Sequence, residues 1–257
     1  MDPSDLIAQI QAAFDALADP QLSARMRAYQ REQFDFLGIP TPQRRAVVTS
    51  LATAGLGQQA LLDIARALWR MPFREYQYAA IDLLAHRRKA LDADAVVSLL
   101  DLAQQQPWWE TVDGLAAVIG DVIRLEPASL GQSQALMDRA LAHDCMWVRR
   151  IAMTHQLGWR LQTDSERLFR YALALAPESE FFIRKAIGWS LRDYAKWHPD
   201  PVIAFVTRHR QQFSPLTLRE ALKHHPDALG ACVRRSARRR ARHPCVRSAR
   251  SCSHPDR

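Results

Sequence analysis

The sequence predicts an all-α protein, an α-solenoid in which antiparallel helix pairs stack on one another. Apolar residues recur at the three- and four-residue spacing of helices through residue 229. Prolines fall at the joints between these segments, and no segment shows the sustained two-residue alternation of a strand. The helical segments also repeat loosely along the chain, which is typical of a solenoid.

The expected helices follow one another with short connections. Ser4 can cap the first helix, and the second is expected over 22–33. Thr41 supplies a cap and Pro42 a first-turn proline for the third helix, which runs through Leu51. Further helices are expected over 58–71, 73–89, 93–105, 109–125, 132–142, 145–158, 165–175, 180–197, 200–211 and 215–224.

One helix of each pair opens in a similar way. Helices that begin at Thr41, Phe73, Trp109, Trp147 and Phe182 recur roughly every 35 residues. Three of them start with an aromatic residue followed by basic residues. We expect these helices to line the concave side of the stack and to form a basic, DNA-binding groove there. Acidic residues would then be left on the outer helices.

The charge of the chain is unevenly distributed. The net charge is +8, but residues 231–257 hold nine arginines and one acid, so the first 230 residues carry equal numbers of acidic and basic side chains. A nucleic-acid partner must therefore be argued from where the charges lie. Residues 1–229 are predicted to fold as one domain, and 230–257 to form an arginine-rich, disordered tail. This tail is either a basic arm that adds salt-sensitive DNA affinity or an extension without a selected role.

The composition predicts a cytoplasmic protein without a metal site. No stretch reaches the roughly 20 uninterrupted apolar residues of a membrane span, and the acidic start lacks the layout of a signal peptide. Only Cys145 lies in the folded domain, and the three tail cysteines form no C-x-x-C pair or zinc module. We expect no cofactor, no metal, no membrane partner, and a monomer that associates with the nucleoid when bound to DNA.

The candidate site combines aromatic, acidic and basic side chains at helical spacing. Trp109 and Asp113 are four residues apart, so they share one face of a helix. On another helix Trp189 stands between Lys185 and Arg192 at similar spacing. Aromatic faces, one carboxylate and several cations suit a site that meets a polyanion and stabilises a positive charge developing on it.

This set suits cleavage of a sugar–base bond in nucleic acid. Loss of the base leaves an oxocarbenium-like sugar, which a carboxylate such as Asp113 would stabilise. The faces of Trp109 and Trp189 can flank that sugar and a positively charged base. A base that already carries a positive charge leaves readily, so no general acid is required. Trp108 and Trp147 are expected in the core.

Arginines suit contacts with phosphate because their planar head offers several donors. The first candidates are Arg150 and Arg192, and the weaker ones are Arg149, Arg184, Lys185, Arg44 and Arg45. Strand cleavage through a Schiff base would need a lysine in the site, and we do not expect it although Lys185 shares a face with Trp189.

The same residues also have purely structural interpretations. Trp109 and Trp189 can be core anchors between repeats, because such interfaces need large apolar side chains. Asp113 can pair with an arginine of the next repeat, and Arg150 can belong to a solvated face. Tyr29 is either a DNA contact or a packing residue beneath the first repeat. The sequence leaves these alternatives open.

Several ordered motifs run from the first helix to Lys223. They are Tyr29 followed by Phe34 to Arg45, Leu68 to Glu75, Trp108 to Asp113, Trp147 to Ala152, Phe181 to Tyr194, and Arg219 to Lys223. In these stretches the chain resembles the AlkD-type DNA alkylation-repair glycosylases, a family of HEAT-like helical repeats. The chain departs from the family pattern at Gln30, where methionine is common, and in its arginine-rich tail.

The resemblance implies excision of N3- and N7-alkylated purines from duplex DNA, which leaves an abasic site. It implies that Asp113 is the catalytic aspartate, that Trp109 and Trp189 are the site tryptophans, and that Arg150 is the site arginine. It also implies that the damaged base is not flipped out of the duplex.

Two further classes of function compete with a glycosylase. One is a non-catalytic helical-repeat module that binds DNA structures or a protein partner on its concave face. The other is a protein scaffold, which would have apolar residues where these helices carry arginine. The combination of Trp109, Asp113, Arg150 and Trp189 favours the enzyme, because a binding module needs no carboxylate facing DNA phosphates.

Overall fold

The computed structural model describes residues 3–127 and 131–230, and the predicted tail from 231 onward lies outside this part of the chain. Within it, thirteen α-helices and two short 3-10 helices account for all the regular elements. The predicted all-α class is therefore confirmed.

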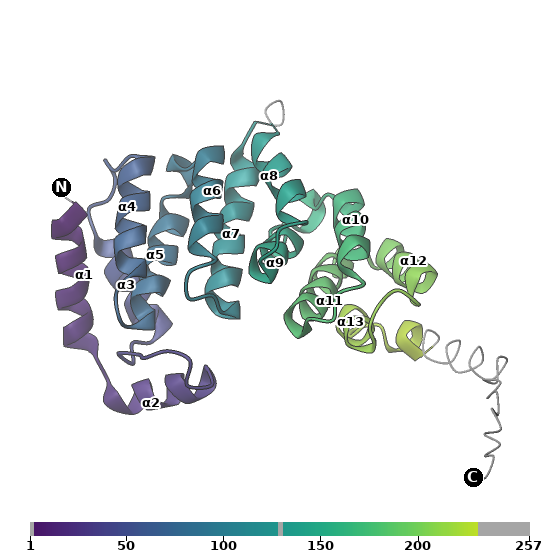
Figure 1. The fold of residues 1–257 in the computed structure, drawn as a ribbon, viewed down its shortest axis with the longest axis horizontal. Helices are drawn as coiled ribbons and strands as arrows, with labels where there is room; N and C mark the ends of the chain where they lie inside the picture. Colours follow the sequence, from purple (N-terminus) through teal and green to yellow (C-terminus); the bar gives the residue numbers. More distant parts are fainter. Residues whose placement is uncertain (1–2, 128–130, 231–257) are drawn as a thin grey trace, which may run out of the picture.

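The helices lie in two rows that together follow an arc (Figure 1). We call the first the inner row, in which each helix contacts the next: α3 (Thr41–Ser50), α5 (Arg74–His86), α7 (Trp109–Leu125), α9 (Met146–Thr154), α11 (Phe181–Ala195) and α13 (Pro215–Ala221). The outer row is α4 (Gln58–Trp69), α6 (Ala93–Leu102), α8 (Gln132–Ala140), α10 (Ser165–Leu175) and α12 (Pro199–His209).

Neighbouring helices of the two rows pack in pairs, so the predicted solenoid is also confirmed. α4 contacts α5, α6 contacts α7, and α8 contacts α9. Towards the C-terminal end, α10 and α12 both pack on α11. At the other end α1 (Pro3–Leu17) covers α3 and α4, whereas α2 (Pro20–Tyr29) stands apart from both rows (Figure 1).

Helix α7 shows how the apolar spacing builds this arrangement. Val112, Leu115, Ile119 and Val122 recur every three or four residues and are almost fully buried. This buried stripe fixes the rotation of α7 between its neighbours. The opposite side of its first turns, which includes Asp113, is therefore left partly exposed.

Two predicted helix caps are wrong. Helix α1 begins at Pro3, so Ser4 lies inside its first turn. In α3 Thr41 is already helical, Pro40 occupies the cap position, and no side chain caps the helix. In both helices a proline lies in the first turn, where its fixed φ favours the helical conformation without a side-chain cap.

The second helix is shorter than its predicted range of 22–33. It ends at Tyr29, because Arg31 and Glu32 have φ angles of 57° and 58° in the left-handed region. Left-handed backbone is costly for residues other than glycine and is maintained only where the surroundings fix it. Residues 30–39, which we call the strap, contain this turn and contact the N-terminal ends of α5 and α7.

A buried carboxylate anchors the strap to α5. The side chain of Glu75 accepts hydrogen bonds from the backbone N–H groups of Leu37, Gly38 and Ile39 at 3.0, 2.8 and 3.2 Å. Gly38 has a φ of 89°, and a Cβ there would lie 2.1 Å from the carbonyl oxygen of Asp19. Only glycine fits this position, and the strap is thereby held close to α2 as well.

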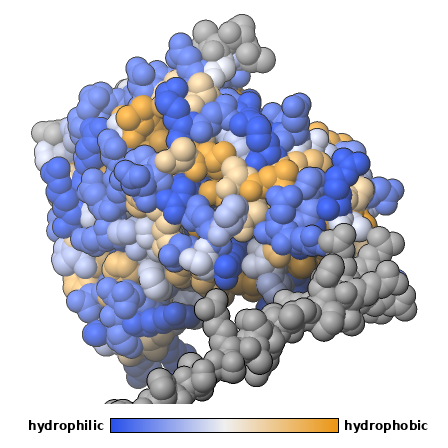
Figure 2. Space-filling model, turned by 45° about the vertical axis from the view of Figure 1, so that its right-hand side comes forward, coloured by the Kyte–Doolittle hydropathy of each residue, from blue (hydrophilic) through white to orange (hydrophobic). Residues whose placement is uncertain are grey.

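The surface is mostly hydrophilic on the face in Figure 2, where hydrophobic residues form a band between polar ones. Six large hydrophobic side chains of the described residues are well exposed, and two of them, Tyr29 and Phe181, lie at the cavity described below. No helix of the described part has both the length and the apolar character needed to cross a membrane.

Candidate functional site

One cavity collects most of the predicted site residues. It has a volume of about 350 Å³ and lies where the end of α2 and the start of the strap meet α7, α9, α11 and α13. We call it the cleft; it is lined by Tyr29, Arg31, Trp108, Trp109, Asp113, Arg150, Phe181, Phe182, Lys185, Trp189, Arg192 and Glu220. Aromatic and charged side chains thus line one opening together.

Helix α7 supplies the acid of the cleft. Trp109 is its first residue and Asp113 follows one turn later, so both side chains project from the face opposite the buried stripe. Both are partly exposed and line the cleft together. The predicted shared face is confirmed.

Arg150 holds Asp113 with two hydrogen bonds. Its Nε donates to Oδ1 at 2.8 Å and its Nη2 donates to Oδ2 at 2.9 Å, while Nη1 donates to the carbonyl oxygen of Phe182. The Arg150 side chain is only 5% exposed and that of Asp113 is 15% exposed. Burial raises the pKa of Asp113, and Arg150 opposes that rise. The arginine therefore favours the ionised form of the acid and fixes the plane of its carboxylate.

Aromatic rings form the floor beneath this ion pair. Trp108, Trp147 and Phe182 contact one another with ring centroids 5.0 to 6.1 Å apart. The guanidinium carbon of Arg150 lies 5.9 Å from the centre of the Phe182 ring. Trp147 is buried as expected, whereas Trp108 is only partly buried and also reaches the cleft. These rings therefore pack against the arginine of the ion pair.

Helix α11 supplies the opposite wall. Lys185, Trp189 and Arg192 follow the predicted spacing and all three line the cleft. Both cations are held by Glu220 of α13, which accepts from Nζ of Lys185 and from Nη1 of Arg192 at 2.7 Å each. Trp189 therefore faces the cavity between two cations that already have an acidic partner.

The end of α2 forms the rim. Tyr29 is 71% exposed, and its ring meets that of Trp109 edge to face with centroids 6.0 Å apart. Next to it, Nε1 of Trp108 donates to the side chain of the buried Gln30 at 2.9 Å. The strap thus fixes Tyr29 at the mouth of the cleft, and left-handed Arg31 stands beside it.

Four of the predicted basic residues lie away from the cleft. One is Arg184, whose Nε donates to the carbonyl oxygen of Glu178 at 2.9 Å. Arg149 is paired with both oxygens of Glu178 at 2.7 Å, and Arg44 and Arg45 share the carboxylate of Asp82. Arg149 and Arg44 are also largely buried. Their guanidinium groups are engaged in contacts within the protein.

The expectation that acids lie on the outer helices is wrong. Asp82, Glu110, Asp113 and Glu220 all belong to the inner row, and each accepts hydrogen bonds from basic side chains of a neighbouring inner helix. Packing brings these helices so close that a buried cation needs an acid within reach. The charges of the inner row are therefore matched from repeat to repeat.

Four residues of the cleft had no assigned role from the residue pattern: Arg31, Phe181, Phe182 and Glu220. The first depends on the left-handed turn after α2, which a helical pattern does not reveal. The phenylalanines and Glu220 lie within the motifs quoted above, but a motif alone does not show which of its side chains face a cavity.

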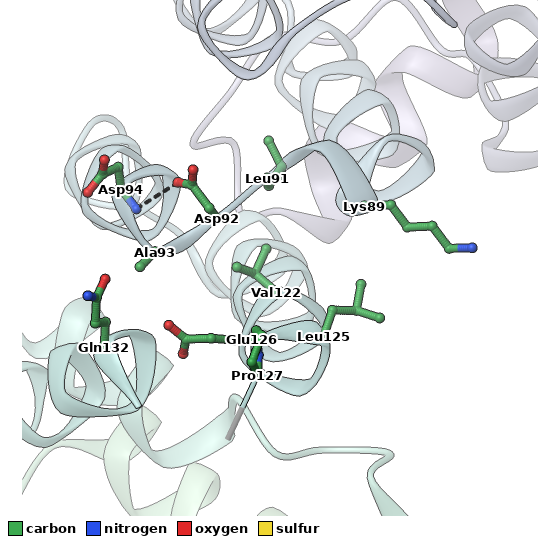
Figure 3. Close-up of a pocket in the computed structure, with 10 residues that line it drawn as sticks. All are labelled: Lys89, Leu91, Asp92, Ala93, Asp94, Val122, Leu125, Glu126, Pro127 and Gln132. Atoms are coloured by element: carbon green, nitrogen blue, oxygen red, sulfur yellow. Dashed lines mark hydrogen bonds between the residues drawn. The ribbon is translucent and has the colours of Figure 1, made fainter. Parts of the chain in front are cut away.

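A second cavity of about 330 Å³ lies away from the cleft, near the starts of α6 and α8 (Figure 3). Two of its three carboxylates have structural partners. Asp92 accepts from the backbone N–H of Asp94 and caps α6, and Glu126 accepts from the N–H of Ser133 at the start of α8. Within the described residues no cluster of histidine, cysteine and acidic side chains could hold a metal ion. The cleft is therefore the candidate site.

One cysteine and one buried histidine of the described residues lie on or next to α9, outside the cleft. Cys145 is a partly buried free thiol at the start of α9. The tail cysteines Cys232, Cys245 and Cys252 lie outside the described residues. His155 is buried beside Trp159, and burial lowers its pKa to about 4. Its imidazole is therefore neutral and packs at the end of α9.

Comparisons with solved structures show chains of the same fold. A predicted DNA alkylation repair enzyme from Enterococcus faecalis is 31% identical over 81% of this chain and 96% of its own length, with a TM-score of 0.75. AlkD2 from Streptococcus mutans is 14% identical, covers 72% of this chain and 89% of its own, and has a TM-score of 0.56. The protein smu.31 from Streptococcus mutans UA159 is also 14% identical, with coverage of 82% and 96% and a TM-score of 0.53.

The two more distant structures are evidence for the fold alone, and no curated protein matches the chain. The family model described as DNA alkylation repair enzyme matches residues 10–225, which is nearly all of the helical stack and includes every residue of the cleft. The chain belongs to the DNA alkylation repair enzyme family.

Proposed function

We propose that this protein is a monofunctional DNA glycosylase, which hydrolyses the N-glycosidic bond of cationic N3- and N7-alkylpurines in duplex DNA. The observation that carries the proposal is the convergence of Trp109, Asp113 and Trp189 on one cleft, although they come from two different helices. A carboxylate that shares a cleft with two indoles matches the charge that develops on a deoxyribose when it loses its base.

The proposed reaction needs little from the protein besides this environment. The bond between C1′ and the purine nitrogen breaks, and its electron pair neutralises the positive charge of the alkylated base. Asp113 stabilises the resulting oxocarbenium-like sugar, as carboxylates do in glycoside hydrolysis. Water then adds to C1′ and loses one proton, so the products are a neutral base and an abasic site. A cationic base leaves without a general acid.

Arg150 acts as a positioning residue in this scheme. Its two hydrogen bonds orient the carboxylate and oppose the effect of burial on the pKa of Asp113. The acid is therefore held as an anion in a site with limited access to water, where its interaction with a positive sugar is strengthened.

Lys185 favours hydrolysis without strand cleavage. A Schiff base requires a neutral, free amine. The ammonium of Lys185 instead donates to Glu220 at 2.7 Å, and it is the one lysine among the described residues that line the cleft. We therefore assign Lys185 to the DNA backbone, together with Arg192, Tyr29 and Arg31.

Base release from methylated duplex DNA by Asp113→Asn tests the proposal. We expect release of 7-methylguanine to fall at least about tenfold, which corresponds to about 1.4 kcal/mol of barrier. Binding should persist because the cations of α11 are unchanged. Asp121→Asn is the matched control, because Asp121 lies on the same helix but does not line the cleft. Equal release by wild type and Asp113→Asn would remove Asp113 from this role.

A non-catalytic module is the alternative function, and the same assay decides it. A module would bind duplex DNA without releasing methylated bases, even as wild type. The carboxylate of Asp113, which lines the cleft, favours the enzyme. An acid at this position weakens the binding of a polyanion, so it is useful only if it contributes to a reaction.

A further inference from the structure

Glu220 is a second acid in the cleft, and the proposed reaction does not use it. Its two oxygens accept separately from Lys185 and Arg192, at 2.7 Å each. The side chains of Arg192 and Glu220 are each 19% exposed and that of Lys185 is 37% exposed. This acid-bridged pair of cations, which we call the fork, forms part of the wall next to Trp189.

Close helix packing fixes the fork. Gly188 lies three residues after Lys185 and four before Arg192, so these residues share one face of α11. A Cβ on Gly188 would lie only 2.4 Å from the Cβ of Glu220. The glycine thus lets α13 approach until Glu220 stands between the two cations. Because Glu220 is on a packed helix, its backbone keeps the carboxylate within reach of both cations when a ligand arrives.

The fork halves the charge that this wall offers to DNA. Two cations with one carboxylate carry a net charge of one, and each cation already has a hydrogen bond that resembles a phosphate contact. A phosphate that binds here must draw the cations away from Glu220 and approach the carboxylate. Resting on the proposed function, we propose that Glu220 is a built-in competitor of the DNA phosphate, which weakens binding to undamaged duplex.

Such a competitor has a functional consequence for a repair enzyme. Backbone contacts are the same at every base pair, so strong contacts would hold the protein on intact DNA. A weaker wall shortens the time spent on each undamaged site. The aromatic cleft, which engages the sugar at the lesion, is unaffected by this competition.

The test measures binding of an undamaged duplex by fluorescence anisotropy over a range of salt concentrations. We expect Glu220→Gln to bind about three- to tenfold more tightly than wild type and to lose affinity more steeply with salt, by about one additional counterion. A purely structural role for Glu220 would not steepen the salt dependence. In the same variant, intact competitor DNA should inhibit base release more strongly.

Two further variants serve as controls. Asp121→Asn removes a carboxylate that also bridges two arginines, Arg88 and Arg124, but outside the cleft. We expect little change, which separates the fork from the general effect of net charge. The double variant Lys185→Gln with Glu220→Gln returns the wall to one net charge, and its salt dependence should return towards that of wild type.

Unchanged or weaker binding by Glu220→Gln, while wild type binds normally, overturns the inference and leaves the proposed function intact. An equal gain in Asp121→Asn also overturns it. Failure of wild type to bind duplex DNA at all would instead overturn the proposed function, and the inference with it.

Discussion

Two arginine–carboxylate ion pairs join the start of helix α7 to the inner-row helices on its two sides, and they differ in what surrounds them. Arg74 of α5 donates to Glu110 at 2.9 Å, and Arg150 of α9 donates to Asp113 at 2.8 Å. Each pair joins adjacent helices of the inner row. Only the second one lines the cleft.

The Arg74 pair is enclosed by further contacts. The guanidinium of Arg74 also donates to Gln77, to the carbonyl oxygen of Gln106 and to Thr111. The central carbon of this guanidinium lies 3.6 Å from the centre of the Phe34 ring. Phe34 belongs to the strap, so the strap covers this pair. The Arg74 side chain is completely buried, and burial lowers its pKa while Glu110 opposes this change.

The Arg150 pair has no such cover. Asp113 has Arg150 as its partner for both oxygens, and the carboxylate borders an open cavity. The comparison shows that an arginine–carboxylate pair has a structural role where the chain covers it. Where the chain leaves it open, it can serve chemistry. The strap, rather than the residue types, makes this difference.

Replacing Arg74 should have the largest effect on stability. Arg74→Met keeps the apolar stem but leaves Glu110 without its cation in a covered site, which should cost about 3–5 kcal/mol of unfolding free energy. Urea unfolding measures this change. Arg150→Met is the matched control and should cost less, because water in the cleft can reach Asp113. Equal losses in both variants would contradict the comparison.

The second largest effect should be the pH dependence of base release, which the Arg150–Asp113 pair controls. Burial raises the pKa of Asp113 and Arg150 opposes the rise. Base release requires the carboxylate, so activity should be lost as pH falls through this raised pKa, by up to about tenfold per pH unit. In Arg150→Gln burial acts without opposition, so the titration should move to higher pH. Carbon-13 NMR of the Asp113 carboxyl group checks this shift, and an unchanged midpoint would contradict it.

Removing the tail should have the smallest effect, because neither ion pair involves it. Truncation after Gly230 removes nine arginines, so the salt dependence of DNA binding should become flatter. Base release under single-turnover conditions should be largely unchanged. Loss of folding in the truncated protein would show that the predicted domain boundary at residue 229 is misplaced.

The helical stack could be predicted because it depends on local signals. The apolar spacing of α7 and α11, and the first-turn prolines, specify where helices form and which face they bury. The same spacing placed Trp109 with Asp113, and Trp189 with two cations. The predictions about charge failed where they concerned partners, because an inner-row acid such as Glu220 is chosen by the distance between helices.

The strap could not be predicted for a similar reason. Left-handed Arg31 and the buried Glu75 carboxylate act together across a long sequence separation. Gln30 is a departure from the family pattern in sequence, yet its side chain accepts a hydrogen bond from Trp108. Its contribution to the cleft is visible only when the two segments lie side by side.

The sequence by itself determined an all-helical chain, its repeating pairs, and the side chains that each inner helix offers on its exposed face. Local spacing is sufficient for these, because a helix repeats every few residues. Only the tertiary structure decided which charges are neutralised by a neighbour, which pair the strap covers, and which carboxylate remains open to a ligand. These depend on how closely separate segments approach, and Coulomb and hydrogen-bond energies change steeply over those few ångströms.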